Sequence, residues 1–430
     1  MISTAADNGW TAPLARDAVH ATVELPGSKS QTNRALVLAA LSANPSHIRG
    51  GLQARDSELM IQALRRLGTG IDAGPDVWTI TPAPFGAATI DTGLAGTVMR
   101  FVPPAAALAR GVVAFDGDPY ARERPMRTLL DGLRQAGVTV EDHHSGRLPF
   151  ALRGNGEVRG GPVRIDASSS SQFVSGLLLS GARYRQGIDV AHVGAGAVPS
   201  APHIEMTLQA LRAAGVQTES DGASRWRVAP GPIQAPDVSI EPDLSNAGPF
   251  LAAALVTGGT VVIPRWPAVT TQAGDALRGL LEQLGAEVTR VGDDLVVRGT
   301  GRIRGVDVDL SATSELCTVV AALAALADSP SRLRGLAHVR GHETDRLAAL
   351  HHELTGLGGQ VSERPDGLSI TPRPLHGGLW RAYADHRMAT AGAIIGLAVP
   401  GVEIDDIAST SKTLPNFVEL WHGMLAQSVA

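Results

Sequence analysis

Short polar clusters come directly before apolar runs of helical length at six places in this 430-residue chain. One example is SKSQTNRALVLAAL from Ser28, and the clusters are rich in serine, threonine, asparagine and glycine. The unpaired N–H groups at the start of a helix attract phosphate and carboxylate groups. Polar residues there also serve as plain N-caps, which any helix requires. We favour anion binding because basic residues lie near the clusters, namely Lys29, Arg34, Arg100, Arg124, Arg346 and Arg387.

The positions of these clusters indicate an internal repeat. The polar-to-apolar runs begin at Ser28, Ala95, Ser169, Leu244, Thr313 and His386. Between them lie amphipathic helical patterns that close at Gly68, Gly137, Gly215, Gly285 and Gly358, where glycine is the expected helix stop. Short β-branched runs such as VWTITP and GTVVIP predict strands. We therefore expect an α/β chain of six units of about 70 residues, arranged as two pseudo-threefold domains of three units each.

The composition limits the class of protein. With 44% hydrophobic and 18% charged residues the chain is expected to be globular and soluble, and it has no run that suits a membrane span. The net charge of −5 argues against a nucleic-acid surface. The N-terminus does not have the pattern of a signal peptide. The single cysteine, Cys317, fits a reducing compartment, so we expect a cytoplasmic protein.

Seven motifs follow one another between residues 26 and 417. The first lacks the G-x-x-x-x-G-K-[ST] frame of a P-loop, so ATP chemistry is not expected. The motifs are PGSKSQTNRA (26–35), LAGTVMRF (94–101), RERP (122–125), SSSSQF (168–173), HETDRL (342–347), ADHRMA (384–389) and SKTLPNF (411–417). The set resembles the motifs of the 5-enolpyruvylshikimate-3-phosphate synthase family in order and spacing.

This resemblance implies a particular domain organisation. Family members have two domains, each built from three βαβαββ units, and the chain crosses between the domains twice. Carried over to this sequence, residues 28–240 form the domain on the shikimate 3-phosphate side. Residues 1–27 and 241–430 form a discontinuous second domain, and the active site lies in the interdomain cleft. The resemblance also implies a monomer that binds only small-molecule substrates and uses no cofactor.

The resemblance assigns two overlapping groups of binding residues. The phosphoenolpyruvate group is Lys29, Gly96, Thr97, Arg124, Gln172, Arg346, Arg387 and Lys412. The shikimate 3-phosphate group is Lys29, Ser30, Arg34, Ser170, Ser171, Gln172, Ser200, Glu315, His338 and His342. Arginine can clamp a phosphate or a carboxylate with two parallel hydrogen bonds, and hydroxyl and amide groups match a sugar-like acceptor.

The implied reaction needs proton transfer at two places, the acceptor hydroxyl and the methylene carbon of the donor. Lys29, Glu315 and Glu343 are the expected catalytic residues, and the sequence does not divide the two proton transfers between the carboxylates. Some positions depart from the commonest family pattern. Glu315 stands where aspartate is common, and His338, His342 and His203 replace asparagine, lysine and tyrosine. His342 would thereby lose a permanent charge near neutral pH.

Two alternatives remain beside this interpretation. UDP-N-acetylglucosamine enolpyruvyl transferase has the same architecture and donor, but most members carry a reactive cysteine in a mobile loop. Cys317 instead lies in an apolar run, where a buried structural thiol is expected. A non-catalytic anion-binding relative would be expected to lack Lys29, Arg124, Glu343 or Lys412, all of which are present. The doublets His143–His144 and His351–His352 show no ligand constellation, so no metal site is expected.

Overall fold

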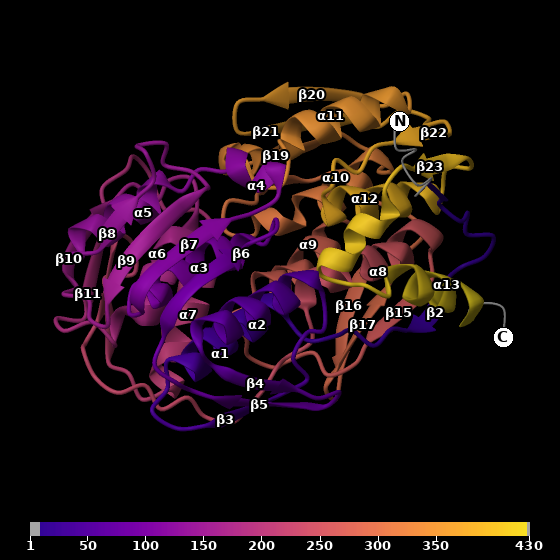
Figure 1. Ribbon diagram of the computed structural model, residues 1–430. Coiled ribbons are helices and arrows are strands. Elements are labelled where there is room, and N and C mark those ends of the chain that lie inside the picture. Colours follow the sequence, from indigo (N-terminus) through magenta and orange to yellow (C-terminus); the bar gives the residue numbers. More distant parts are fainter. Residues whose placement is uncertain (1–8, 428–430) are drawn as a thin grey trace, which may run out of the picture. The chain divides into compact units, whose positions relative to one another are not determined.

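The computed structural model describes residues 9–427. The chain divides into two compact units (Figure 1). The continuous unit is Pro26–Glu241. The discontinuous unit takes the described residues up to Leu25 together with those from Pro242 onward. Among the described residues, no helix combines the length and the apolar character that a membrane crossing requires.

The continuous unit contains three four-stranded sheets, in the orders β14-β3-β5-β4, β6-β7-β9-β8 and β10-β11-β13-β12. The strands are β3 (Ser46–Arg49), β4 (Gly70–Ala73), β5 (Val77–Thr81), β6 (Gly86–Asp91), β7 (Arg110–Asp116), β8 (Thr139–Glu141), β9 (Phe150–Asn155), β10 (Gly161–Ile165), β11 (Ile188–His192), β12 (Thr218–Ser220), β13 (Arg225–Val228) and β14 (Val238–Ser239). The helices are α1 (Lys29–Ala40), α2 (Arg55–Leu67), α3 (Gly96–Ala106), α4 (Pro119–Glu123), α5 (Arg127–Gln135), α6 (Ser171–Gly181) and α7 (Pro202–Ala213).

The discontinuous unit has sheets in the orders β16-β17-β15-β2, β18-β19-β21-β20 and β1-β23-β22. Its strands are β1 (Trp10–Thr11), β2 (His20–Thr22), β15 (Thr260–Ile263), β16 (Glu287–Val291), β17 (Asp294–Arg298), β18 (Asp307–Asp309), β19 (Ser331–Arg334), β20 (Gln360–Arg364), β21 (Gly367–Thr371), β22 (Gly378–Trp380) and β23 (Val402–Ile404). Its helices are α8 (Leu244–Thr257), α9 (Leu277–Gln283), α10 (Cys317–Ala325), α11 (Arg346–Gly356), α12 (His386–Gly396) and α13 (Phe417–Gln427). Its 3₁₀ turns are η1 (Ala273–Ala276), η2 (Ser314–Leu316), η3 (Ala337–Gly341) and η4 (Ile407–Lys412).

Five of the sheets share one pairing scheme. In the second sheet of the continuous unit, β6 runs parallel to β7, and β9 pairs antiparallel with both β7 and β8. The same scheme recurs in the other four-stranded sheets, which confirms the predicted repeat. The last sheet keeps the parallel pair, β22 with β23, and one antiparallel partner, but it has three strands and takes that partner, β1, from the N-terminal part of the chain. The sixth unit is therefore a shortened version of the repeat.

Strands on either side of the two chain crossings complete the first sheet of each unit. β2, which precedes the first crossing, pairs in parallel with β15, which follows the second crossing. β14, which precedes the second crossing, pairs in parallel with β3, which follows the first. Each unit therefore closes its first sheet with a strand from far along the sequence.

The helices agree with the two predicted patterns. The six polar-to-apolar runs form α1, α3, α6, α8, α10 and α12, and in the fifth the 3₁₀ turn η2 precedes the α-helix. The five closing glycines all have positive φ, from 77° at Gly215 to 124° at Gly68. This backbone region is open to glycine but costly for residues with a Cβ atom, which explains why these helices end where they do.

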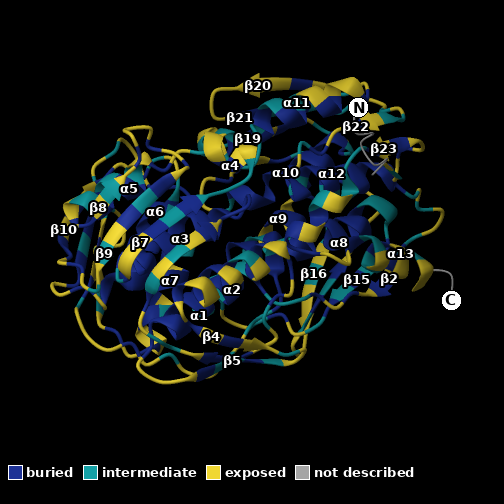
Figure 2. Cartoon of the chain, viewed as in Figure 1, coloured by how far each residue is buried: buried dark blue, intermediate teal, exposed yellow. Residues whose placement is uncertain are grey.

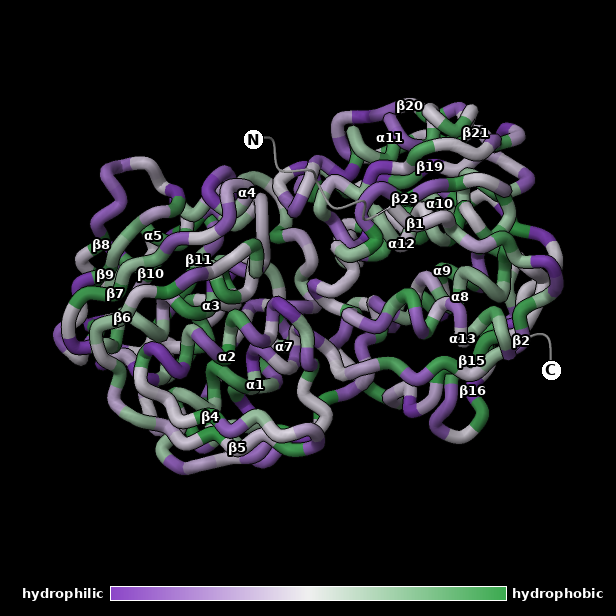
Figure 3. Tube along the Cα trace, turned by 45° about the vertical axis from the view of Figure 1, so that its right-hand side comes forward, coloured by the Kyte–Doolittle hydropathy of each residue, from purple (hydrophilic) through white to green (hydrophobic). Residues whose placement is uncertain are grey.

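Each unit has its own hydrophobic core, formed by the inward faces of its helices and sheets (Figure 2). Hydrophobic segments run along helices such as α2 and α8 (Figure 3). The predicted burial of Cys317 is confirmed, since its side chain is fully buried at the start of α10 and burial raises the pKa of its thiol to about 11. It therefore behaves as a core residue and not as a reactive thiolate.

The pairing of β2 with β15 can be tested with a matched pair of glycines. A Cβ atom at Gly259 would lie 1.9 Å from the backbone oxygen of Val19, whereas one at exposed Gly279 on α9 would meet nothing within 4 Å. Gly259→Ala should therefore lower the free energy of unfolding by about 2–4 kcal/mol, because the backbone clash can be relieved only by moving β2. Gly279→Ala should raise it by about 0.5–1 kcal/mol. Urea denaturation measures both, and equal effects would contradict the pairing.

Candidate functional site

In the continuous unit, the predicted site residues lie at the starts of α1, α3 and α6 and nearby. Ser28 is the N-cap of α1, and Lys29 is the first residue of that helix. The Nζ atom of Lys29 lies 3.4 Å from Oδ2 of Asp56, a buried residue in the first turn of α2. Asp56 was not among the predicted residues, because its place near a helix start is typical of an ordinary dipole contact. It fixes the direction of the Lys29 side chain.

Arg34 lies one turn further along α1 and is only 2% exposed. Its Nε atom donates to the Thr207 hydroxyl at 2.8 Å, and its terminal nitrogens donate to the backbone oxygens of Ser30 and His203, both at 2.9 Å. The guanidinium also lies over the ring of Phe101, 5.0 Å from its centroid, in a cation–π contact. Burial lowers the pKa of Arg34 to about 9, which leaves it charged at neutral pH. Arg34 thus ties α1 to α7 beneath the polar surface.

Gly96, Arg124 and Gln172 converge, although they come from three different motifs. A Cβ atom at Gly96 would lie 3.2 Å from Oε1 of Gln172 and 3.3 Å from both terminal nitrogens of Arg124. The Arg124 side chain makes one long contact, 3.4 Å to the backbone oxygen of Leu94, and its buried Nε atom has no hydrogen-bond partner among the described residues. The missing side chain of Gly96 therefore keeps a guanidinium and an amide oriented toward the same small space.

Thr97, next to Gly96, is held from α1. The side-chain amide of Asn33 donates to the Thr97 hydroxyl at 2.6 Å, and both residues are buried. Because the hydroxyl oxygen accepts this bond, its own proton remains available to an acceptor. Asn33 lies within the first motif but was not predicted as a site residue; its signal was only a buried polar residue inside an apolar helix.

Hydroxyl groups gather around the start of α6. Ser170 is its N-cap and accepts from the backbone N–H of Gln172 at 3.2 Å, while Ser171 is buried in the first turn. Ser200 lies just before α7 with a φ of 52°, and Ser30 is half-buried on α1. The start of α6 therefore presents hydroxyl and backbone N–H groups.

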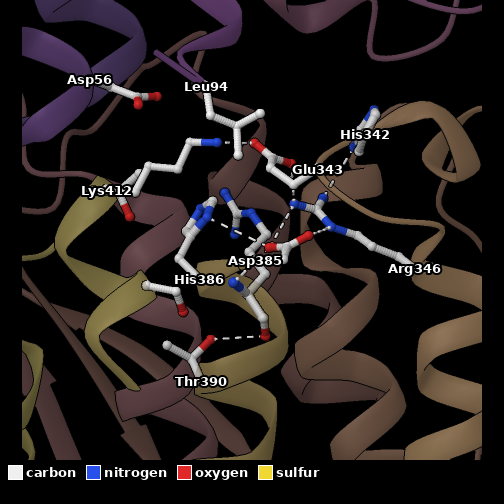
Figure 4. A network of polar contacts seen from close by, with 12 residues as sticks. Asp56, Leu94, His342, Glu343, Arg346, Asp385, His386, Thr390 and Lys412 are labelled. Carbon is white, nitrogen blue, oxygen red and sulfur yellow. Dashed lines mark hydrogen bonds and ion pairs between the residues drawn. The ribbon is translucent and has the colours of Figure 1, made fainter. Parts of the chain in front are cut away.

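In the discontinuous unit, the buried guanidinium of Arg346 is the centre of a charge network (Figure 4). Its Nε atom donates to Oδ2 of Asp385 at 2.8 Å, and its Nη2 atom donates to Oδ1 of Asp385 at 3.2 Å and to Oε2 of Glu343 at 3.0 Å. Its Nη1 atom donates to Nδ1 of His342 at 3.2 Å. Burial alone would lower the pKa of Arg346, but Asp385 and Glu343 together raise it above the ordinary arginine value. These bonds use four of its five N–H groups, so Arg346 has little capacity left for a ligand.

Glu343 lies between two cations. Its second carboxylate oxygen is 2.5 Å from Nζ of Lys412, and its side chain is 11% exposed while that of Lys412 is 5% exposed (Figure 4). Glu343 lies two residues after the end of η3, and Lys412 is the last residue of η4, so this pair joins two motifs that are 69 positions apart. The arrangement holds an acidic and a basic group in direct contact, where a proton can be exchanged.

Three further predicted residues lie near this network. His342 accepts a hydrogen bond from Arg346, which requires an uncharged Nδ1 and places its proton on Nε2. Its ring meets that of His338 edge-on, with centroids 5.8 Å apart. Burial lowers the pKa of His338 to about 4, although the nearby carboxylate of Glu315 in η2 raises it. His338 is therefore uncharged at neutral pH, and both imidazoles act as hydrogen-bonding groups.

Arg387 differs from Arg346 because its guanidinium makes no hydrogen bond or ion pair among residues 9–427. It follows Asp385, which is fully buried and is the N-cap of α12, accepting from the backbone N–H of Arg387 at 2.9 Å. A small pocket next to Arg387 is lined by Ser245, Asn246, Pro249, Val319, His386, Thr390, Thr410, Thr413 and Leu414. Asp385 was not predicted, although its place before a helical run is an N-cap signal. Arg387 is thus a cation of this unit that is available to an anionic ligand.

No three histidine, cysteine, aspartate or glutamate side chains come together as a metal site within the described part of the chain.

The predicted site residues fall into two groups, one in each unit. Lys29, Ser30, Arg34, Gly96, Thr97, Arg124, Ser170, Ser171, Gln172 and Ser200 belong to the continuous unit, and Glu315, His338, His342, Glu343, Arg346, Arg387 and Lys412 belong to the discontinuous unit.

Comparison with solved structures defines the class of fold. The chain is similar to EPSP synthase from Acinetobacter baumannii, with a TM-score of 0.79 and 22% identity over 97% of this chain and 98% of that one. It is also similar to the enolpyruvyl transferase NikO from Streptomyces tendae, with a TM-score of 0.77 and 18% identity over 96% of both chains. The predicted two-domain α/β enolpyruvyl transferase fold is thereby confirmed.

Sequence comparison then narrows the class. The chain is 55% identical to a 3-phosphoshikimate 1-carboxyvinyltransferase of Kocuria rhizophila, over 98% of this chain and 97% of that protein. The model of the EPSP synthase (3-phosphoshikimate 1-carboxyvinyltransferase) family matches residues 14–421. The chain belongs to this family.

The lowered pKa of His338 predicts a pH dependence of stability. The folded state resists protonation of His338, whose pKa is about 4 against an ordinary value of about 6.5. Its uncharged form therefore supports folding above pH 6.5, and this contribution is lost as the pH falls toward 4. When the pH is lowered from 7 to 4.5, the free energy of unfolding should fall in both proteins. The fall should be about 2 kcal/mol smaller in His338→Asn than in the parent chain. Urea denaturation at both pH values measures this, and parallel losses would contradict the burial of an uncharged imidazole.

Proposed function

We propose that this chain transfers the enolpyruvyl group of phosphoenolpyruvate to the 5-hydroxyl of shikimate 3-phosphate, releasing phosphate. The observation that carries the proposal is the contact of Glu343 with both Lys412 and Arg346, in the unit where Arg387 has no acceptor among residues 9–427. This arrangement offers a group for proton transfer and a cation for the donor's negative charges. The 55% identical relative, named for this reaction, supports the same choice.

The donor requires two anion sites because phosphoenolpyruvate carries a phosphate and a carboxylate. Arg124 and Arg387 are the arginines of the predicted group whose guanidinium N–H groups are least occupied by the described residues. Each can bind one anionic group with two parallel hydrogen bonds. Gly96, Thr97 and Gln172 contribute a backbone N–H, a hydroxyl and an amide, while Lys29 and Lys412 add positive charge. Arg346 serves chiefly to hold Glu343 and Asp385 in place.

The acceptor requires donors for a phosphate and partners for ring hydroxyls. The hydroxyl rim of Ser30, Ser170, Ser171 and Ser200 supplies such donors, together with Gln172 and Lys29. Arg34 supports this rim from below through the backbone oxygen of Ser30. Glu315, His338 and His342 are proposed to contact the acceptor as a carboxylate and two imidazoles.

We further propose that both groups act on one substrate pair, so that the active site lies in the interdomain cleft. The reasoning is chemical, since the donor sites Arg124 and Arg387 belong to different units and a single phosphoenolpyruvate molecule needs two anion sites. Closure around the substrates would also exclude water from the reacting atoms.

The reaction proceeds by addition and elimination. The acceptor hydroxyl loses a proton as its oxygen bonds to C2 of phosphoenolpyruvate, and C3 gains a proton to become a methyl group. The C2–O bond to phosphate then breaks, and C3 loses a proton to restore the double bond. Glu343 and Glu315 are the carboxylates proposed for these proton transfers, and Lys29 and Lys412 stabilise the developing charge. We propose that the enzyme works as a cytoplasmic monomer without a cofactor, with small molecules as its only partners.

Phosphate release from phosphoenolpyruvate tests the proposal directly. The assay is run in parallel with shikimate 3-phosphate and with UDP-N-acetylglucosamine as the acceptor. Release with shikimate 3-phosphate alone is expected. Release with the nucleotide sugar alone would keep the fold and the donor site but overturn the acceptor. Absence of release with both would favour a non-catalytic anion binder.

Glu343→Gln should separate catalysis from binding. The amide keeps the size of the side chain but cannot accept a proton, so kcat should fall by about 10²–10⁴-fold while the Kd for shikimate 3-phosphate changes little. The exposed Glu403 on β23 provides a matched control, since Glu403→Gln should leave both quantities unchanged. Steady-state kinetics and calorimetry measure them. An equal loss of acceptor affinity would show instead that Glu343 has a structural role.

A further inference from the structure

The segment that leads from β22 into α12 has an unusual backbone. Tyr383 and Ala384 have φ values of 55° and 52°, so two consecutive residues with a Cβ atom occupy the left-handed region. Such residues are strained there and persist only when surrounding contacts hold them. The next residues are Asp385, the N-cap of α12, and then His386 and Arg387. The strained turn therefore determines where α12 begins and how the Arg387 side chain leaves the backbone.

A buried carboxylate on α11 holds this turn. Glu353 is 2% exposed, and its Oε1 atom accepts from the Tyr383 hydroxyl at 2.5 Å. Its Oε2 atom accepts from the backbone N–H of Arg381 at 3.0 Å. The exposed ring of His352 lies 2.9 Å from the same Oε1 atom. One carboxylate thus binds the side chain and the backbone of the segment that contains the strained pair.

The same helix holds the segment at a second point. Arg346 begins α11 and binds Asp385 through two hydrogen bonds, and Glu353 follows seven residues later, about two helical turns along the same face. Between these two contacts, the backbone N–H of Ala382 donates to Asp405 at 2.8 Å and that of Asp385 donates to the oxygen of Ala382 at 2.9 Å. The turn from Arg381 to Asp385 is therefore fixed at both ends by α11.

We infer that Glu353 is a positioning residue for the donor site, which holds the left-handed turn at Tyr383 and Ala384 and so sets the direction of Arg387. The inference rests on the proposed role of Arg387 in binding phosphoenolpyruvate. Glu353 acts from within the core and touches no substrate. Burial and the bond to Glu353 raise the pKa of Tyr383, so the phenol stays protonated and remains a donor to Glu353.

Two variants loosen this clamp to different degrees. Tyr383→Phe removes the hydroxyl alone, while Glu353→Met removes both acceptor oxygens and with them the contacts to Tyr383 and Arg381. The KM for phosphoenolpyruvate should rise roughly tenfold when Glu353 is replaced and by a smaller factor in Tyr383→Phe, because Arg387 is no longer fully held in its binding direction. The KM for shikimate 3-phosphate should stay within about twofold, because its proposed ligands lie outside this turn.

Tyr184→Phe is a matched control for the loss of a buried tyrosine hydrogen bond. The Tyr184 hydroxyl donates to the backbone oxygen of Pro104 at 2.8 Å in the continuous unit, whereas the turn belongs to the discontinuous unit. Because the Tyr184 hydroxyl is fully buried, this variant should lower Tm at least as much as Tyr383→Phe but leave the KM for phosphoenolpyruvate unchanged. A rise in that KM in both variants would overturn the inference, since it would reflect general destabilisation.

A rescue variant tests the strain itself. Glycine adopts positive φ without penalty, so Ala384→Gly added to Glu353→Met should restore most of the affinity for phosphoenolpyruvate. Failure of the rescue, or an unchanged KM in both clamp variants, would overturn the role of Glu353. Phosphate release by the parent chain with shikimate 3-phosphate is measured in the same series. If the parent chain releases no phosphate, the proposed function is contradicted, whereas the role of Glu353 is not.

Discussion

The buried guanidinium of Arg346 has to be neutralised, because a charge removed from water is stable only with partners that replace its hydration. Asp385 supplies two hydrogen bonds and is at the same time the N-cap of α12. Glu343 supplies a third and is joined in turn to Lys412. One buried charge therefore binds the N-cap of α12, the Glu343 carboxylate and, through it, the Lys412 side chain. Removing one partner of such a pair would leave an uncompensated charge in the core, which typically costs about 3–5 kcal/mol.

The arginines of this protein divide into two kinds that composition alone does not distinguish. Arg34 and Arg346 are each 2% exposed, and protein acceptors occupy most of their N–H groups. Arg124 and Arg387 lie at similar motif positions but have few or no such acceptors in the described part of the chain. The first kind builds the site and the second kind is available to a ligand. Burial and the supply of oxygen acceptors decide this difference, and both depend on packing.

The repeated fold provides helix starts, whereas a few local deviations from the repeat provide the site. The left-handed turn at Tyr383 and Ala384 is one deviation. Gly96 is another, because a methyl group on Gly96 would crowd Arg124 and Gln172. The first departs from the regular unit in its backbone, and the second in its missing side chain. A strained backbone is tolerated when neighbouring contacts hold it, as Glu353 holds the turn before α12.

Much of the architecture could be predicted from the sequence because its signals are local. The helical runs, the closing glycines with positive φ and the buried Cys317 follow from periodicity and composition within about a dozen residues. The family followed from motifs that are contiguous in the chain. The pairings of β2 with β15 and of β14 with β3 gave no such signal, nor did the contact of Asn33 with Thr97 or of Glu353 with Tyr383. These partners lie far apart in the sequence, so only the packing of the chain brings them together. The sequence by itself thus determined the elements and the chemical groups, and the tertiary structure decided which charges are occupied and which remain available.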